Sequence, residues 1–251
     1  MIPIRDTIPS RSPAIMLIAL LMVNIIVFLF ELLMTPAQLE AFIHLFGVIP
    51  ARYTHPQWAM AVGFPVDSYL PFLTSMFLHG GWLHIIGNMW TLWIFGDNVE
   101  DRMGPIRFLV FYLLCGFAAA IVHWITNPDS TIPTIGASGA IAGVLGAYLF
   151  LYPRARIIAM IPIFIFPYFF ELPAFVYLGF WILTQIFSGT LALAQPQDIG
   201  GIAFWAHVGG FAAGILLHPF FIRRTDRKLR PDEWAMETAW RPYQKRENWS
   251  W

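Results

Sequence analysis

The stretch GASGAIAGVLGAYLFL, residues 136–151, places a glycine-flanked serine at the start of an uncharged run of small and large apolar residues. Apolar runs of this kind are typical of membrane helices, in which every backbone polar group must be paired within the segment. Pro153 follows and cannot continue a helix interior. We therefore predict a membrane helix over 137–152 that carries Ser138 at its N-terminal end.

The composition of the whole chain also indicates a membrane protein. Of its 251 residues, 58% are hydrophobic and 12% are charged, with a mean hydropathy of +0.63. Soluble domains contain about 45–50% apolar and about 25% charged residues. The formal net charge of zero argues against a nucleic-acid-binding surface. Cys115 is the single cysteine, and we interpret it as a small buried hydrophobe.

Six apolar runs separated by glycine, proline or polar residues predict an all-α membrane protein with six transmembrane helices. The domain organisation is a short N-terminal segment 1–13, a helical domain 14–222 with a long first loop 35–80, and a tail 223–251. The first run is too long for a signal-peptide core, so we expect no cleaved leader. The predicted helices are 14–34, 81–98, 105–126, 137–152, 173–193 and 203–222.

Residues 156–170 are apolar enough to span a membrane, but Pro162 and Pro167 interrupt them. We predict an interfacial or re-entrant segment here. The distribution of basic residues supports this choice, because cytoplasmic loops carry an excess of Lys and Arg. With six spans and the N-terminus inside, 14 of the 15 basic residues are cytoplasmic, and only Arg52 lies outside. A seventh span would move the eight basic residues of the tail to the outside.

Polar side chains gather at the N-terminal ends of the second, fourth and sixth predicted helices. The second helix has His79, His84 and Asn88, the fourth has Ser138, and the sixth has His207. Alternate helices run in the same direction, so these residues are expected at one depth in the outer part of the membrane. Ionisable residues within membrane spans are costly and mark functional sites.

This set of side chains suits nucleophilic catalysis. A serine hydroxyl such as that of Ser138 becomes a strong nucleophile when an adjacent base takes its proton, and the neutral imidazole of His207 can do so. His84 and Asn88 are four residues apart, on one helix face. Their N–H groups and the backbone N–H of Ser138 are candidate donors to a tetrahedral oxyanion.

Glycines around these residues favour close helix contacts. Gly136 and Gly139 flank the serine and permit tight turns. The spacings Gly139/Gly143 and Gly210/Gly214 are those of small residues at membrane helix interfaces. We expect them to bring the fourth and sixth helices together.

Each feature alone has a simpler interpretation. The motif around Ser138 can serve only helix packing, and His207 can be a hydrogen-bonded core histidine. A transporter or proton-relay protein could use His79, His84 and His207, although no internal repeat is visible. A haem protein with paired histidines would leave the serine without a role. No Cys/His cluster has metal-ligand spacing, so we expect no metal or cofactor.

Taken together, the three clusters resemble the rhomboid intramembrane proteases. The family pattern is His-x4-His-x3-Asn on helix two, Gly-x-Ser-Gly on helix four and Ala-His-x2-Gly on helix six. The resemblance covers about 14–222. The matching residues are His79, His84 and Asn88; Gly136, Ser138 and Gly139; Ala206, His207 and Gly210; and, at the end of helix two, Gly96, Glu100, Asp101, Arg102 and Gly104.

The resemblance implies an intramembrane serine endopeptidase with a six-helix fold. Ser138 would be the nucleophile, and His207 the general base and acid. His84 and Asn88 would stabilise the oxyanion, and His79 would support the polar site. An inactive relative that binds membrane segments without cutting them is the nearest alternative, but such relatives typically lack the serine or the histidine.

The substrates implied are transmembrane proteins, cut within a lipid bilayer near its outer face. The expected location is a bacterial-type plasma membrane, with both termini cytoplasmic. One departure from the family pattern concerns the first loop, 35–80. Many bacterial members carry a Trp-Arg pair there, and the nearest match in this chain is Arg52-Tyr53.

Overall fold

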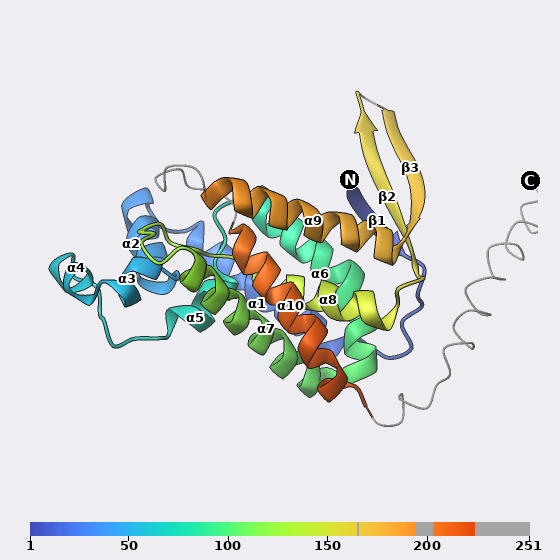
Figure 1. The fold of residues 1–251 in the computed structure, drawn as a ribbon, viewed down its shortest axis with the longest axis horizontal. Coiled ribbons are helices and arrows are strands. Elements are labelled where there is room, and N and C mark those ends of the chain that lie inside the picture. The colour runs from blue at the N-terminus through green and yellow to red at the C-terminus, as the bar shows by residue number, and fades with distance from the viewer. Residues whose placement is uncertain (165, 194–202, 224–251) are drawn as a thin grey trace, which may run out of the picture.

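The protein is a helical bundle with one small β-sheet (Figure 1). The computed structural model describes residues 1–164, 166–193 and 203–223. The predicted tail 223–251 lies outside this range, apart from its first residue. The six longest apolar helices coincide with the predicted runs. They are α1 (Ile15–Glu31), α6 (Trp82–Met103), α7 (Pro105–Thr126), α8 (Ser138–Leu151), α9 (Ala174–Leu193) and α10 (Phe204–Phe221).

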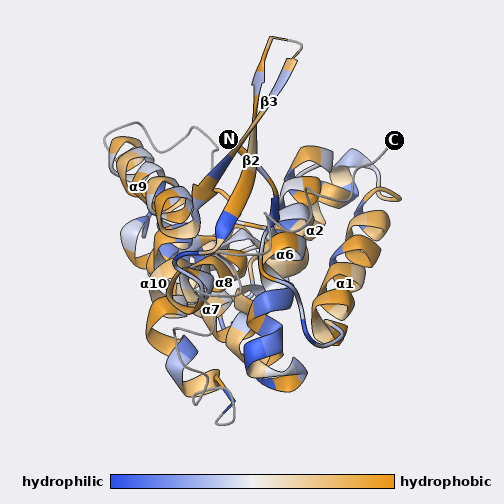
Figure 2. Ribbon diagram, turned by 90° about the vertical axis from the view of Figure 1, so that its right-hand side faces the viewer, coloured by the Kyte–Doolittle hydropathy of each residue, from blue (hydrophilic) through white to orange (hydrophobic). Residues whose placement is uncertain are grey.

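Within the described residues, three helices are long and apolar enough to cross a membrane: α7, α9 and α10. The helices α1 and α8 are apolar but shorter. Helix α6 has 22 residues and ends in a charged turn that contains Glu100 and Arg102. Figure 2 shows that the helices consist largely of hydrophobic residues, and many of their large hydrophobic side chains are exposed, as expected for a protein surrounded by lipid.

The predicted first loop contains short helices rather than irregular chain. The first four begin with proline at N1, where its missing N–H costs no hydrogen bond. Thr35 and Gln38 form a capping box at the first of them. Figure 1 shows that these helices lie together at one end of the bundle. They are α2 (Pro36–Phe46), α3 (Pro50–Thr54), α4 (Pro56–Ala61), α5 (Pro71–Thr74) and the 3-10 helix η1 (Ser75–Phe77).

A buried arginine holds this first loop in place. The side chain of Arg52 is almost completely buried. Its Nε and Nη2 donate to the carbonyl oxygen of Pro65 at 2.8 and 2.6 Å, and Nη1 donates to that of Leu45 at 3.4 Å. The guanidinium also lies against the rings of Tyr53 and Phe64. The loop without a Trp-Arg pair is therefore organised by Arg52.

Three antiparallel strands depart from the all-α expectation. They are β1 (Ile2–Asp6), β2 (Arg156–Ile163) and β3 (Phe166–Pro173), in the order β1–β2–β3. The segment predicted as interfacial or re-entrant is thus a hairpin that projects from the bundle (Figure 1). Pro162 pairs with Pro167 across it. Prolines prevent a regular helix but are tolerated at strand positions that need no N–H donor.

Helix α8 lies at the centre of the bundle. Its residues 139–148 are all buried, and they pack mainly against α10 and α7. Glu100 of α6 fixes α1 to this core. Its carboxylate accepts hydrogen bonds from the backbone N–H groups of Met16 and Leu17 at 2.9 and 2.7 Å. These N–H groups belong to the first turn of α1 and have no partner within that helix.

Candidate active site

Ser138 and His207 are in hydrogen-bond contact. Ser138 is the first residue of α8, and His207 lies in the first turn of α10. The Ser138 Oγ lies 2.8 Å from Nε2 of His207. Only 8% of His207 is exposed. A serine next to a buried imidazole has the geometry of a nucleophile with its base.

His84 and Asn88 lie beside the loop that precedes Ser138. A Cβ added at Gly136 would lie 2.6 Å from Nε2 of His84 and 3.6 Å from Nδ2 of Asn88. The φ angle of Gly136 is +122°, which glycine adopts without strain. Gly136 therefore lets both side chains approach the serine.

The hydrogen bonding of His84 determines which ring nitrogen can donate. Its Nδ1 accepts from the backbone N–H of Gly80 at 3.4 Å, so the proton is on Nε2. Nε2–H then points toward the Gly136–Ser138 loop. Asn88 Nδ2 is buried and has no protein partner among the described residues. The N-terminus of α8 adds backbone N–H groups without intrahelical partners and the positive end of the helix dipole.

The loop before Ser138 is fixed to its neighbours. The backbone N–H of Gly136 donates to Ser75 O at 2.8 Å, and Thr134 forms a β-bridge with Val48. The Thr134 hydroxyl also lies 2.8 Å from Nε2 of His123 on α7. These contacts fix the loop before Ser138 to η1, to Val48 and to α7, and so restrict the position of the serine.

His79 lies next to these residues. It is buried, and its ring centroid is 5.1 Å from that of His84. Its backbone N–H donates to the carboxylate of Glu31 at 3.2–3.3 Å. Both its ring nitrogens lack a protein partner among the described residues. A buried polar group normally needs a hydrogen-bond partner, so these atoms are positioned to bind water.

Glycines bring the two halves of the site together. A Cβ at Gly210 of α10 would lie 1.9 Å from the carbonyl oxygen of Gly139 on α8. One turn further along, a Cβ at Gly214 would lie 1.9 Å from Gly143 O. The backbones of α8 and α10 are therefore in direct contact, and this contact permits the Ser138–His207 hydrogen bond.

No sequence motif had singled out Gln185, which also contacts the site. Its Oε1 lies 2.8 Å from Nδ1 of His207. Gln185 is on α9, 22 positions before the histidine. The signal available in the sequence was an amide within the apolar run 173–193, because polar residues in membrane helices face other protein groups.

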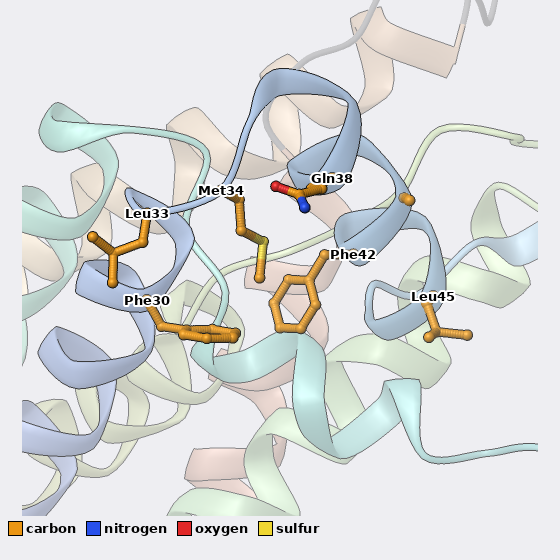
Figure 3. Close-up of a pocket in the computed structure, with 7 residues that line it drawn as sticks. Phe30, Leu33, Met34, Gln38, Phe42 and Leu45 are labelled. Atoms are coloured by element: carbon orange, nitrogen blue, oxygen red, sulfur yellow. The ribbon is translucent and has the colours of Figure 1, made fainter.

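A separate apolar hollow lies between the end of α1 and α2 (Figure 3). Phe30 and Met34 face Phe42 there, Leu33 also lines the hollow, and Gln38 is the one polar side chain among the described residues that line it. None of the candidate site residues His79, His84, Asn88, Ser138, Gln185 and His207 lines this hollow. The described residues that line it include no nucleophile or base.

The part of the chain that contains Ser138 and His207 is similar to known proteins. A family model described as the Rhomboid domain matches residues 67–224, more than half of the chain. Rhomboid protein 1, mitochondrial, of Saccharomyces cerevisiae is 28% identical over 169 residues, 66% of this chain and 45% of that protein. Rhomboid protease GluP of Bacillus subtilis is 42% identical over 79 residues, 32% of this chain and 15% of that protein. The chain thus matches less than half the length of either relative.

Proposed function

Since this chain belongs to the rhomboid family, we propose that it is an intramembrane serine endopeptidase that uses Ser138 and His207 as a catalytic dyad. The observation that carries this proposal is the 2.8 Å contact between Ser138 Oγ and His207 Nε2. The Bacillus subtilis relative named as a rhomboid protease supports the same activity.

In the proposed first step, Ser138 attacks the carbonyl carbon of a substrate peptide bond. His207 Nε2 accepts the hydroxyl proton as the C–O bond forms. The carbonyl oxygen becomes an oxyanion, and the donors nearest to it are His84 Nε2–H, Asn88 Nδ2–H and the Ser138 backbone N–H. His79 contributes polar surface and bound water beside them.

The later steps reverse this proton transfer. The imidazolium of His207 donates its proton to the leaving amine as the C–N bond breaks, which leaves an acyl ester on Ser138. A water molecule then attacks the ester, again with His207 as the base, and releases the new carboxyl terminus. Every step uses protein side chains, the substrate and water.

The substrate class we propose is transmembrane proteins. A transmembrane helix protects its peptide bonds by internal hydrogen bonds, so it must unwind locally before Ser138 can attack. Glycine, proline or polar residues near the cleaved bond would lower the cost of unwinding. Three helices of the described residues are long and apolar enough to cross a membrane, where such substrates are found.

We further propose that α1, α6, α7, α8, α9 and α10 all cross the membrane. Six crossings and the basic-residue bias put both termini in the cytoplasm. The Ser138 end of α8 then lies near the outer face. A bacterial-type plasma membrane is the location we favour, although relatives include mitochondrial proteins such as that of yeast.

The test is labelling of the full-length chain in detergent with a fluorophosphonate probe, which reacts with activated serines. We expect wild type to be labelled and Ser138→Ala and His207→Ala to lose labelling. Ser188→Ala removes another hydroxyl from an apolar helix, α9, and should be labelled as wild type. Equal labelling of Ser138→Ala, or an unlabelled folded wild type, would contradict the proposal.

Cleavage is measured separately in liposomes with a model single-span substrate that has a glycine-rich transmembrane segment. We expect product with wild type and none with Ser138→Ala. Labelling at Ser138 without cleavage of any unwinding-prone substrate would retain the activated serine but reject transmembrane proteins as the substrate class.

A further inference from the structure

The second ring nitrogen of His207 has a specific partner. Its Nδ1 lies 2.8 Å from Oε1 of Gln185, while its Nε2 faces Ser138 Oγ. We propose that Gln185 is a positioning residue that holds His207 in the tautomer and orientation needed to accept the proton of Ser138. This inference rests on the proposed protease function.

The chemistry of the amide oxygen determines the tautomer. Oε1 of Gln185 can only accept a hydrogen bond, so the proton of the neutral imidazole must be on Nδ1. Nε2 then carries the lone pair, and this lone pair faces the hydroxyl of Ser138. The opposite tautomer would place a proton between Nε2 and Oγ and would block general-base catalysis.

The orientation of the Gln185 amide is itself set by a neighbour. Its Nε2 donates to the hydroxyl oxygen of Thr184 at 3.2 Å. With the NH₂ group engaged there, Oε1 is the end that faces His207. A reversed amide would put two N–H donors against Nδ1 and would favour the unproductive tautomer.

Helix α9 restrains the imidazole at two points. The Trp181 ring lies 5.9 Å from that of His207 at an angle of 34°. Trp181 and Gln185 are four residues apart and share one face of α9. One side chain packs against the imidazole and the other binds its Nδ1, so rotation of the ring about χ2 would break both contacts.

A neutral partner suits this location. His207 is buried within the bundle, and a carboxylate beside it would carry a large desolvation penalty. An amide fixes the tautomer without a buried charge. It also gives the imidazolium of the transition state less stabilisation than a carboxylate would, and this difference can be measured.

The arrangement makes the dyad depend on the position of α9. Four of the twenty residues of α9 are buried, namely Ala174, Tyr177, Leu178 and Gly189. This helix is therefore held to the bundle by few contacts. Displacement of α9 would move Oε1 of Gln185 away from Nδ1 of His207 and would free His207 to change tautomer. The ability of His207 to act as a base would therefore depend on the position of α9.

Three variants of the full-length protein separate hydrogen bonding from packing. Gln185→Met keeps the volume but removes the acceptor, and Gln185→Glu keeps an acceptor but adds a charge. Thr190→Val on the same helix is the matched control, because its exposed hydroxyl donates a hydrogen bond to Ile186 O of α9 itself. Each is compared with wild type for fluorophosphonate labelling rate across about pH 5–9 and for thermal stability in detergent.

We expect Gln185→Met to be labelled about 10- to 100-fold more slowly with little change in melting temperature, a part of the about 10²–10⁴-fold that a positioned base supplies. Gln185→Glu should remain active, and the acidic limb of its pH–rate profile should move to higher pH, because a carboxylate stabilises the imidazolium. If Gln185 served only packing, neither the labelling rate of Gln185→Met nor the acidic limb of Gln185→Glu would change. A wild-type rate in Gln185→Met, or an unchanged acidic limb in Gln185→Glu, overturns the proposal.

A second readout does not require activity. In ¹⁵N-histidine NMR of the Ser138→Ala protein, the His207 signal should report a proton on Nδ1, and adding Gln185→Met should shift the ring toward a mixture of tautomers. If wild type is never labelled at Ser138, the protease function fails, and this spectrum still decides the Gln185–His207 link. An identical His207 signal in both proteins would overturn it.

Discussion

Gly210 of α10 lies so close to Gly139 of α8 that a Cβ on Gly210 would stand 1.9 Å from the Gly139 carbonyl oxygen. No side chain can be accommodated at such a distance without separation of the two backbones. Since Ser138 precedes Gly139 and His207 lies three residues before Gly210, this contact sets the distance between the proposed nucleophile and base.

Gly210→Ala should therefore impair both folding and activity. The extra methyl must push α10 away from α8, and overpacking of this kind costs about 1–3 kcal/mol. We expect a lower melting temperature in detergent and slower fluorophosphonate labelling of the folded fraction. Gly179→Ala on α9 is the matched control, because among the described residues a Cβ there meets no atom beyond its own helix backbone within 4 Å. It should be neutral or stabilising by about 0.5–1 kcal/mol, and equal effects of the two substitutions would contradict the argument.

Loss of either proposed oxyanion donor should reduce turnover more than substrate binding. His84→Ala and Asn88→Ala should each lower kcat for a transmembrane substrate by about 10²–10³, with a smaller change in KM, because the donors act on charge that develops in the transition state. Steady-state cleavage in liposomes measures both constants. His44→Ala is the control, since His44 is on α2 and bonds to Glu40 O of its own helix. A rise in KM alone would instead assign these residues to ground-state binding.

The strand β1 carries a carboxyl whose protonation should affect stability. Burial raises the pKa of Asp6 from 3.8 to about 7; the Tyr148 hydrogen bond opposes this shift, and the nearby Asp97 charge adds to it. The folded protein therefore keeps the proton over a pH range in which the unfolded chain loses it. The stability that Asp6 contributes is complete below about pH 4 and is lost as the pH rises through about 7.

Thermal unfolding in detergent tests this sign. Between about pH 5 and about pH 8, wild type should lose more stability than Asp6→Asn, which stays neutral and keeps an oxygen that can accept from Tyr148. Other titrating groups are common to both proteins and cancel in the comparison. If the two melting temperatures changed in parallel, Asp6 would not be the group responsible.

The helices could be predicted from sequence because long apolar runs are bounded by glycine and proline. Helix α7 begins at Pro105 and ends at Thr126, as predicted. Helix α6 continues five residues beyond its predicted end, to Met103. Its last turns are polar, so a prediction from hydropathy alone ends the helix before them. Glu100 is buried in this turn because it binds the start of α1, a long-range contact that no local pattern contains.

The site was predictable only in part, for a related reason. Ser138, His207, His84 and Asn88 stand in recognisable motifs at the starts of alternate helices. Gln185 stands in no motif, and its contact with His207 depends on how α9 packs against α10.

The hairpin formed by β2 and β3 was not predicted. A period of two residues in hydrophobicity usually signals a strand. The hairpin lacks this alternation because both of its faces are apolar. The pairing of β2 with β1 joins distant parts of the chain, so no local pattern predicts it either.

The hairpin formed by β2 and β3 should lie in lipid. Near its turn, Phe164 is 97% exposed, Phe166 71% and Tyr168 60%. Figure 2 shows this hydrophobic hairpin extending beyond the helices. In water, such an apolar surface would promote aggregation. In a membrane protein it continues the apolar outer surface of the helices, and aromatic rings favour the membrane interface.

A single engineered cysteine can measure this environment. Cys115 is the one native cysteine and is completely buried, so a label on Phe164→Cys reports on the hairpin alone. An environment-sensitive fluorophore there should emit at shorter wavelength in liposomes, and brominated lipids should quench it. Asp67→Cys, in the exposed first loop, should show neither effect. Because unlabelled Phe164→Cys would be shielded by lipid, it should also react slowly with membrane-impermeant thiol reagents; reaction as fast as that of Asp67→Cys, without quenching, would place the hairpin in water.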